Sequence, residues 1–179
     1  MHTEYEVKVL EIDSEEFIKI IEKLGGTKVG EFNYRRYVYD FNPKRNDEWI
    51  RLRTDGNNTT LTYKNITNDK FDGTKELEIA VDDFDITNEM LEVLGYKHKG
   101  YQENKRIRYM LDNVEIDFDS WPMIPTYMEI EGKNNDEIEA TIKKLGIDKE
   151  KVTSMNTQNI YLNYGILIDE IKELRFDAK

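Results

Sequence analysis

Charged residues recur along this chain at two-residue spacing, with mainly apolar or aromatic residues between them. The first example is Glu4-Tyr5-Glu6-Val7-Lys8, near the N-terminus. Because side chains alternate between the two faces of a β-strand, charges at this spacing all point to one face. The same pattern returns, in both signs, in Arg51-Leu52-Arg53, Thr60-Leu61-Thr62-Tyr63-Lys64, Glu76-Leu77-Glu78, Arg106-Ile107-Arg108, Asp117-Phe118-Asp119 and Glu129-Ile130-Glu131. It is typical of strands with one apolar packing face and one charged face.

If the charged faces share one interior, that interior holds both carboxylates and cationic side chains. The acidic set is Glu4, Glu6, Glu76, Glu78, Asp117, Asp119, Glu129 and Glu131, and the basic set is Lys8, Arg51, Arg53, Lys64, Arg106 and Arg108. Burying so many ionisable groups is costly unless each is paired or coordinated. We therefore expect the interior to be wet and to hold a ligand that needs both signs of charge.

The two sets match the two halves of a metal-bound polyphosphate. Carboxylates suit a hard divalent cation such as Mg²⁺ or Mn²⁺, which prefers oxygen ligands. Arginine binds phosphate oxygens in bidentate geometry, and lysine binds them as a point charge. The charges therefore favour a metal-chelated polyphosphate as the ligand. The alternative that they leave open is an antiparallel sheet whose charges form cross-strand ion pairs.

Eight predicted strands must position these charges. They cover residues 4–10, 34–41, 49–54, 59–64, 75–81, 101–111, 114–120 and 126–132. Most are joined by short turns such as Asp55-Gly56-Asn57-Asn58, which predicts an antiparallel sheet that curls or closes. Helices are predicted over residues 14–24, 87–95 and 136–145, with one more in the tail at about 166–176. The predicted fold class is α+β, with the helices packed outside the sheet.

Length and composition favour a single domain. The 179 residues suit one unit over 1–179, with a core at about 1–165 and a helical tail at about 166–176. The 37 Asp and Glu exceed the 26 Lys and Arg, and the net charge of −11 argues against a general nucleic-acid or membrane binder. There is no cysteine for a thiolate site and no apolar run of transmembrane length. We expect a cytoplasmic monomer or homodimer.

In their order along the chain, these motifs resemble the signature of the CYTH superfamily, the triphosphate tunnel metalloenzymes. The resemblance covers about residues 1–165 and is carried by Glu4-x-Glu6-x-Lys8, Arg51-x-Arg53, Lys64, Glu76-x-Glu78, Arg106, Arg108, Asp119 and Glu129-x-Glu131. The superfamily includes class IV adenylate cyclases, thiamine triphosphatases and inorganic triphosphatases. The stretch from Asp119 to Gly132, which contains Trp121-Pro122, resembles a bacterial branch often described as class IV adenylate cyclase-like.

The resemblance implies an eight-stranded antiparallel β-barrel, a tunnel that binds the triphosphate of a small molecule with one or two divalent cations. Carried over by position, the main metal carboxylates would be Glu4, Glu6, Glu129 and Glu131, with Asp119 as a further ligand or water holder. The residues on phosphate oxygens would be Lys8, Arg51, Arg53, Lys64, Arg106 and Arg108. Glu76 and Glu78 would contact a second metal or orient the basic side chains. Within this set, the expected catalytic residues are Glu4, Glu6, Lys8 and Lys64.

Three functions remain open from the sequence. A metal-dependent triphosphatase acting on tripolyphosphate, a nucleoside triphosphate or thiamine triphosphate needs only the shared tunnel, and we expect this activity first. A class IV adenylate cyclase, which converts ATP to cyclic AMP and pyrophosphate, would also need an adenine pocket. A non-catalytic polyphosphate- or nucleotide-binding module would not need the near-complete acidic set.

Two positions depart from the pattern of many superfamily members. The lysine often found two residues before Arg106 is replaced by Asn104. A second-strand tyrosine that can assist proton transfer is shifted or replaced by Val38. A tyrosine-assisted mechanism is therefore not expected. Trp49 and Trp121 are predicted to serve packing and not base stacking.

Overall fold

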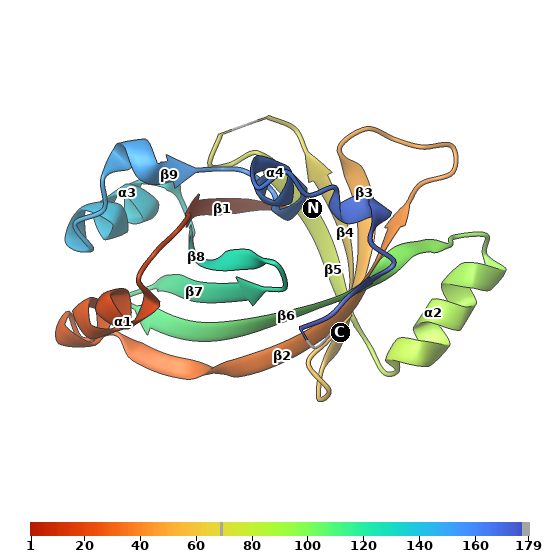
Figure 1. The fold of residues 1–179 in the computed structure, drawn as a ribbon, viewed down its shortest axis with the longest axis horizontal. Helices are drawn as coiled ribbons and strands as arrows, with labels where there is room; N and C mark the ends of the chain where they lie inside the picture. The colour runs from red at the N-terminus through yellow and green to blue at the C-terminus, as the bar shows by residue number, and fades with distance from the viewer. Residues whose placement is uncertain (69, 177–179) are drawn as a thin grey trace.

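The eight predicted strands form a closed antiparallel β-barrel. The computed structural model describes residues 1–68 and 70–176. Neighbouring strands follow the order β6-β2-β3-β4-β5-β1-β8-β7, and β7 pairs back with β6. The predicted barrel and its fold class are therefore confirmed (Figure 1). The strands are β1 (His2–Val9), β2 (Thr27–Asp40), β3 (Glu48–Thr54), β4 (Thr59–Ile66), β5 (Thr74–Val81), β6 (His98–Leu111), β7 (Val114–Trp121) and β8 (Ile124–Gly132).

Helices cover the outside of the barrel. They are α1 (Ser14–Lys23), α2 (Phe84–Val93), α3 (Asn135–Lys144) and α4 (Thr157–Asn163). In Figure 1, α1 and α3 lie at one side of the barrel and α2 lies at the opposite side. Ile21 of α1 and Ile138 of α3 are buried in one core cluster, whereas Phe84 of α2 packs on Tyr39 and Leu52 in another. This outer apolar packing leaves the inner face of the sheet to charged residues. No helix among the described residues has both the length and the apolar character needed to cross a membrane.

The register of the strand ladders brings charged residues of distant segments to neighbouring positions. Lys8 of β1 lies opposite Glu129 of β8, and Glu129 lies opposite Asp117 of β7. Arg106 of β6 lies opposite Asp119 of β7. Because inward and outward residues alternate, a shift of one residue would turn a whole charged set to the outside. The ladders therefore decide which charges meet.

The second strand is longer than its sequence pattern predicted. β2 begins at Thr27, whereas the alternation of apolar residues predicts a start at residue 34. Its first part is a strand because it pairs with β6, with Thr27 opposite Met110. Val29 in this part is 54% exposed, so the segment buries too little to show a clear apolar alternation.

The prediction of a helix over residues 166–176 is wrong. This segment contains a 3₁₀ turn at Ile168–Glu170 and the short strand β10 (Glu173–Leu174), which pairs in parallel with β6. Ile168 and Leu174 are both buried against the barrel, in the same cluster as Trp121. These apolar residues therefore dock the tail on its own chain one by one, without forming a helical stripe. The helix that does form is α4, and a further short strand, β9 (Val152–Thr153), pairs with β1.

Candidate active site

The inside of the barrel contains a cavity of about 1000 Å³. Every residue that the sequence predicts for the site lines it, namely Glu4, Glu6, Lys8, Arg51, Arg53, Lys64, Glu76, Glu78, Arg106, Arg108, Asp119, Glu129 and Glu131. Asp117, which belongs to the same alternating set, is fully buried in the wall. The barrel therefore brings the predicted residues together, and their binding roles stay predictions.

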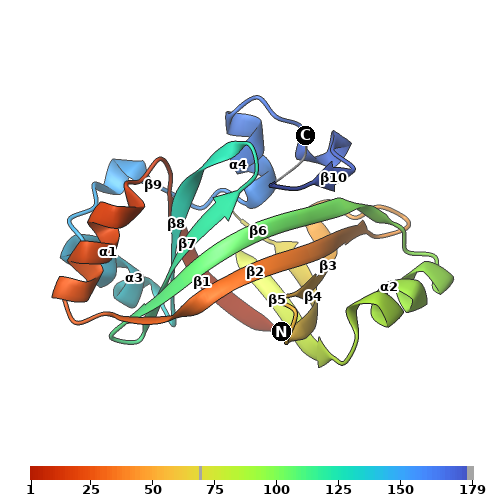
Figure 2. The same cartoon turned by 60° about the horizontal axis from the view of Figure 1, so that its bottom comes forward.

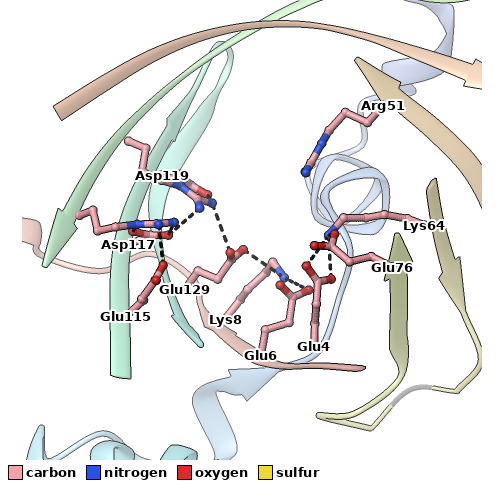
Figure 3. Close-up of polar contacts among 12 residues, drawn as sticks. Glu4, Glu6, Lys8, Arg51, Lys64, Glu76, Glu115, Asp117, Asp119 and Glu129 are labelled. Carbon is pink, nitrogen blue, oxygen red and sulfur yellow. Dashed lines mark hydrogen bonds and ion pairs between the residues drawn. The ribbon is translucent and has the colours of Figure 1, made fainter. Parts of the chain in front are cut away.

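Lys8 joins two carboxylates in the part of the wall formed by β1 and β8. Its Nζ lies 2.9 Å from Glu6 Oε1 and 3.3 Å from Glu129 Oε2 (Figure 3). Burial disfavours the charged lysine, but the two carboxylates outweigh burial and raise the pKa of Lys8. Burial likewise opposes the charged form of Glu129, yet Lys8 and Arg106 lower the pKa of Glu129 below its usual range. Both groups are therefore charged at neutral pH.

Lys64 joins a second pair of carboxylates next to the first. Its Nζ lies 2.7 Å from Glu4 Oε2 and 3.2 Å from Glu76 Oε2 (Figure 3). Burial and the charge of Glu76 outweigh the attraction of Lys64, so the pKa of Glu4 is raised. Glu4 is therefore a buried carboxylate whose negative charge is only partly compensated by the protein.

Arg106 is enclosed by carboxylates in the part of the wall formed by β6, β7 and β8. Its Nε and Nη2 donate to the two carboxylate oxygens of Asp119 at 2.7 and 2.6 Å. Nη1 lies 2.5 Å from Asp117 Oδ2, and Nη2 donates to Glu129 Oε1 at 3.2 Å. Arg108 is held similarly, because its Nε and Nη2 each donate to Asp117 at 2.8 Å. These two arginines therefore hold the acidic wall together, and contact with phosphate would require some of these ion pairs to loosen.

Glu131 is a carboxylate of the cavity wall that makes no ion pair with any described residue. Burial, with the nearby charges of Glu129, Glu4 and Glu6, raises the pKa of Glu131 to about 8. Within residues 1–68 and 70–176, no three His, Asp or Glu side chains form a ready-made metal cage. Even so, the donor chemistry fits a divalent cation, because repelling carboxylate oxygens are the ligands that Mg²⁺ and Mn²⁺ prefer. Such a cation would remove the repulsion that raises the pKa of Glu131.

Arg51 and Arg53 of β3 contribute positive charge from another part of the barrel. Figure 3 shows Arg51 reaching into the space apart from the acidic cluster. Its Nη2 lies 3.4 Å from Glu78 Oε2, a long contact for an ion pair, and Arg53 lies 4.5 Å above the ring of Tyr34. Arg53 makes no ion pair with a described residue, and burial beside Arg51 lowers its pKa. This wall therefore carries positive charge that an anion could neutralise.

Arg36 of β2 adds a third guanidinium that the sequence motifs did not predict. It lies opposite Arg53 across the β2–β3 ladder and lines the cavity. Burial and the charge of Arg51 lower the pKa of Arg36, and no carboxylate among the described residues pairs with it. The signal in the sequence was its spacing of two residues from Val38, which also lines the cavity. The signal is weak because Arg35 beside it is also charged.

The two departures from the superfamily pattern have clear positions in the structure. Val38 and Asn104 both line the cavity, so no second-strand tyrosine and no lysine before Arg106 occupies it at these places. Lys105 lies instead over the ring of Phe176, with Nζ 4.7 Å from its centroid. Tyr127 of β8 does line the cavity, but burial and two nearby carboxylates raise the pKa of its hydroxyl well above the usual range. It is therefore a neutral hydroxyl and not a base.

The two tryptophans differ in their surroundings. Trp121 is buried in the cluster formed with α4 and the tail, as a packing residue would be. Trp49 is half-buried and lines the cavity two residues before Arg51. The prediction of packing therefore fits Trp121 better than Trp49.

Comparisons with known proteins agree with this architecture. The family model described as the CYTH domain matches residues 2–158. A Methanocaldococcus jannaschii protein named "Putative adenylate cyclase MJ0240" is 24% identical over 163 residues, which are 83% of this chain and 93% of that protein. The solved PH1012 protein of Pyrococcus horikoshii has a TM-score of 0.76 and 24% identity, over 86% of this chain and 96% of that one. The Hippeastrum protein HpAC1 has a TM-score of 0.60 and 14% identity over both whole chains. At these identities the two solved structures show the fold alone.

Proposed function

Because the chain belongs to the CYTH domain family, we propose that it is a divalent-metal-dependent triphosphatase that hydrolyses a triphosphate inside its barrel. The substrate is tripolyphosphate, a nucleoside triphosphate or thiamine triphosphate. The observation that carries the proposal is the division of the cavity wall into an undercompensated acidic part around Glu131 and a basic part with few acidic partners. A bound metal–triphosphate would neutralise both parts at once.

The acidic part would hold the metal, Mg²⁺ or Mn²⁺. Its proposed ligands are Glu4, Glu6, Glu129 and Glu131, with Asp119 as a further ligand or water holder. When bound, the metal would supply charge neutralisation at the phosphate and a lowered pKa for a coordinated water. Lys8 already contacts Glu6 and Glu129, and Lys64 contacts Glu4. They would therefore keep the ligands oriented and contact phosphate from the same side.

The basic part would hold the phosphate chain. Arg51 and Arg53 would donate to phosphate oxygens, since most of their donors have no carboxylate partner among the described residues. Glu78 would orient Arg51, because it accepts from Thr62 Oγ1 at 2.6 Å and lies beside the arginine. These guanidinium groups would offset the charge that develops on the leaving phosphate when water attacks. Arg106 and Arg108 would act mainly by holding the acidic wall in shape.

Names of related proteins support two activities of one tunnel. The Hippeastrum structure is described as that of an adenylyl cyclase candidate with a dominant triphosphatase activity. The Methanocaldococcus protein is named for adenylate cyclase. Hydrolysis needs only the tunnel and is our first proposal, while cyclisation of ATP is the second. A non-catalytic binding module is the third, and the acidic wall argues against it because a pure anion binder has no use for these carboxylates.

The experiment that tests the proposal measures products from three substrates. Purified protein is incubated with tripolyphosphate, ATP or thiamine triphosphate, with Mg²⁺, with Mn²⁺ or with EDTA. Phosphate, pyrophosphate and cyclic AMP are then quantified. Metal-dependent release of phosphate without cyclic AMP supports the triphosphatase, and cyclic AMP with pyrophosphate from ATP supports the cyclase. Binding of triphosphate with no product from any substrate would leave only the binding module.

A further inference from the structure

Arg36 and Trp121 make a contact inside the cavity that none of the sequence motifs contains. The Cζ atom of Arg36 lies 4.3 Å from the centroid of the Trp121 ring, and both residues line the cavity. Arg36 Nε donates to Gln102 Oε1 at 2.8 Å. Its two terminal nitrogens donate to no acceptor among the described residues. Arg36 is therefore fixed through Nε and its flat face, and its terminal donors are available to a ligand as far as the described residues go.

Trp121 contributes a second donor at the same place. The residue is only 4% exposed, and its Nε1–H is buried with no hydrogen-bond acceptor in the described part of the chain. A buried donor without an acceptor is destabilising, so such a group usually has a structural or functional explanation. A ligand that brings a hydrogen-bond acceptor to this N–H would supply such an explanation.

The C-terminal segment, residues 156–174, holds Trp121 in position. The ring of Tyr161 in α4 meets the Trp121 ring edge-on, with centroids 6.3 Å apart and planes at 87°. The Tyr161 hydroxyl donates to the carbonyl oxygen of Pro122 at 2.7 Å, next to Trp121 in the turn between β7 and β8. Ile168 and Leu174 pack in the same cluster. Figure 2 shows this segment beside the tip of the β7–β8 hairpin and along β6. Its docking therefore fixes a side chain that lines the cavity.

We propose that Arg36, Gln102 and Trp121 form an anion subsite that binds the free end phosphate of a triphosphate, and that the docked C-terminal segment positions it. The inference rests on the proposed triphosphate binding but not on hydrolysis. An end phosphate carries more charge and more free oxygens than a phosphate within the chain. Those oxygens accept from the terminal nitrogens of Arg36, and a shift of the Trp121 ring would bring its buried Nε1–H within their reach. Arg51 and Arg53, on the adjoining strand, then bind the other phosphates of the triphosphate.

The test measures tripolyphosphate binding in EDTA, where metal-dependent turnover does not occur. In a Trp49→Phe background Trp121 is the only tryptophan, since the chain has two. Adding tripolyphosphate is expected to change its fluorescence, and the titration gives Kd. In the same background, Arg36→Ala is expected to weaken binding about 10- to 100-fold, the range for lost charge-assisted hydrogen bonds. Binding to Arg36→Ala is followed by calorimetry as well, so that the readout does not depend on the indole.

Matched variants separate the subsite from a structural effect. Arg35→Ala removes the same charge from the neighbouring residue, which is 44% exposed and lies 3.5 Å from Asp85, and should leave Kd within about twofold. Trp121→Phe keeps an aromatic ring under Arg36 but removes the N–H, and should weaken binding measured by calorimetry about 3- to 10-fold. Tyr161→Phe loosens the turn and should weaken binding less than Arg36→Ala.

The outcomes distinguish this inference from the proposed function. Unchanged tripolyphosphate affinity in Arg36→Ala, or equal losses in Arg36→Ala and Arg35→Ala, would overturn the subsite. If Trp121→Phe does not fold, as judged by circular dichroism, Arg36→Ala decides alone, because Arg36 lines the cavity and is itself a member of no core cluster of the described residues. If Arg36→Ala loses binding and the parent protein hydrolyses no triphosphate, the subsite is supported and the proposed triphosphatase activity is excluded.

Discussion

The carboxylate of Glu131, which has no ion-pair partner among the described residues, makes the stability of the metal-free protein depend on pH in a defined direction. Its pKa is raised from 4.5 to about 8 by burial and by Glu129, Glu4 and Glu6. The folded chain therefore holds a proton between these pH values that the unfolded chain releases. Stability must then fall as the pH rises through this window and level off above about 8. Glu131→Gln removes the titrating group and with it this part of the pH dependence.

The size of the effect follows from the displacement of the pKa. At about 1.36 kcal/mol per pH unit, a pKa of about 8 lowers the free energy of unfolding by roughly 4 kcal/mol between pH 5 and pH 9. Because Glu131 is only half-buried, solvent screening reduces this, and we expect about 2–4 kcal/mol. The stability of Glu131→Gln relative to the parent should therefore rise by this amount from pH 5 to pH 9. Saturating Mg²⁺ or Mn²⁺ should stabilise the parent most at high pH, where the carboxylate is charged.

The assay is urea unfolding of the EDTA-treated proteins at pH 5, 7 and 9, followed by circular dichroism. Glu139→Gln is the matched control, since this exposed residue pairs with Lys149 at 3.0 Å on the surface. It should shift stability by less than about 0.5 kcal/mol at every pH. Parallel pH profiles for the parent and Glu131→Gln would refute the reasoning that like charges crowd around this carboxylate.

Three further outcomes follow from the cavity wall. Arg106→Met should destabilise the fold by about 3–5 kcal/mol in urea unfolding, because it strands buried carboxylates, and a loss below about 1 kcal/mol would contradict this. Arg53→Ala should raise KM for tripolyphosphate about 10- to 100-fold with little change in the unfolding midpoint. Lys105→Ala, which changes a residue outside the cavity, should leave KM unchanged. Equal effects of the two substitutions on KM would show that Arg53 does not bind phosphate. Glu6→Gln should abolish metal-dependent turnover while Glu16→Gln, on α1, should not, and a fully active Glu6→Gln would exclude Glu6 as a metal ligand.

Much of the site could be predicted from the sequence because β-strand geometry is local. A two-residue period assigns each charge to one face wherever the strand lies, so Glu4, Lys8 and Arg53 could be placed on a common interior before any strand pairing was known. Turn residues between the strands made antiparallel pairing the natural arrangement. The same local logic failed for residues 166–176, because apolar residues that dock separately on a barrel can mimic a helical stripe.

The sequence by itself determined that the alternating charged residues face the cavity, although it missed Arg36, and the tertiary structure decided which of them have partners. Arg106 and Arg53 look alike in the sequence, yet Arg106 is enclosed by three carboxylates and Arg53 has none among the described residues. Glu131 and Glu129 differ in the same way, because within residues 1–68 and 70–176 only Glu129 contacts a lysine and an arginine. Ion pairing depends on register and closure of the barrel, which join residues more than a hundred positions apart, such as Lys8 and Glu129. Those long-range ladders, and not the local period, divide the wall into an acidic part and a basic part.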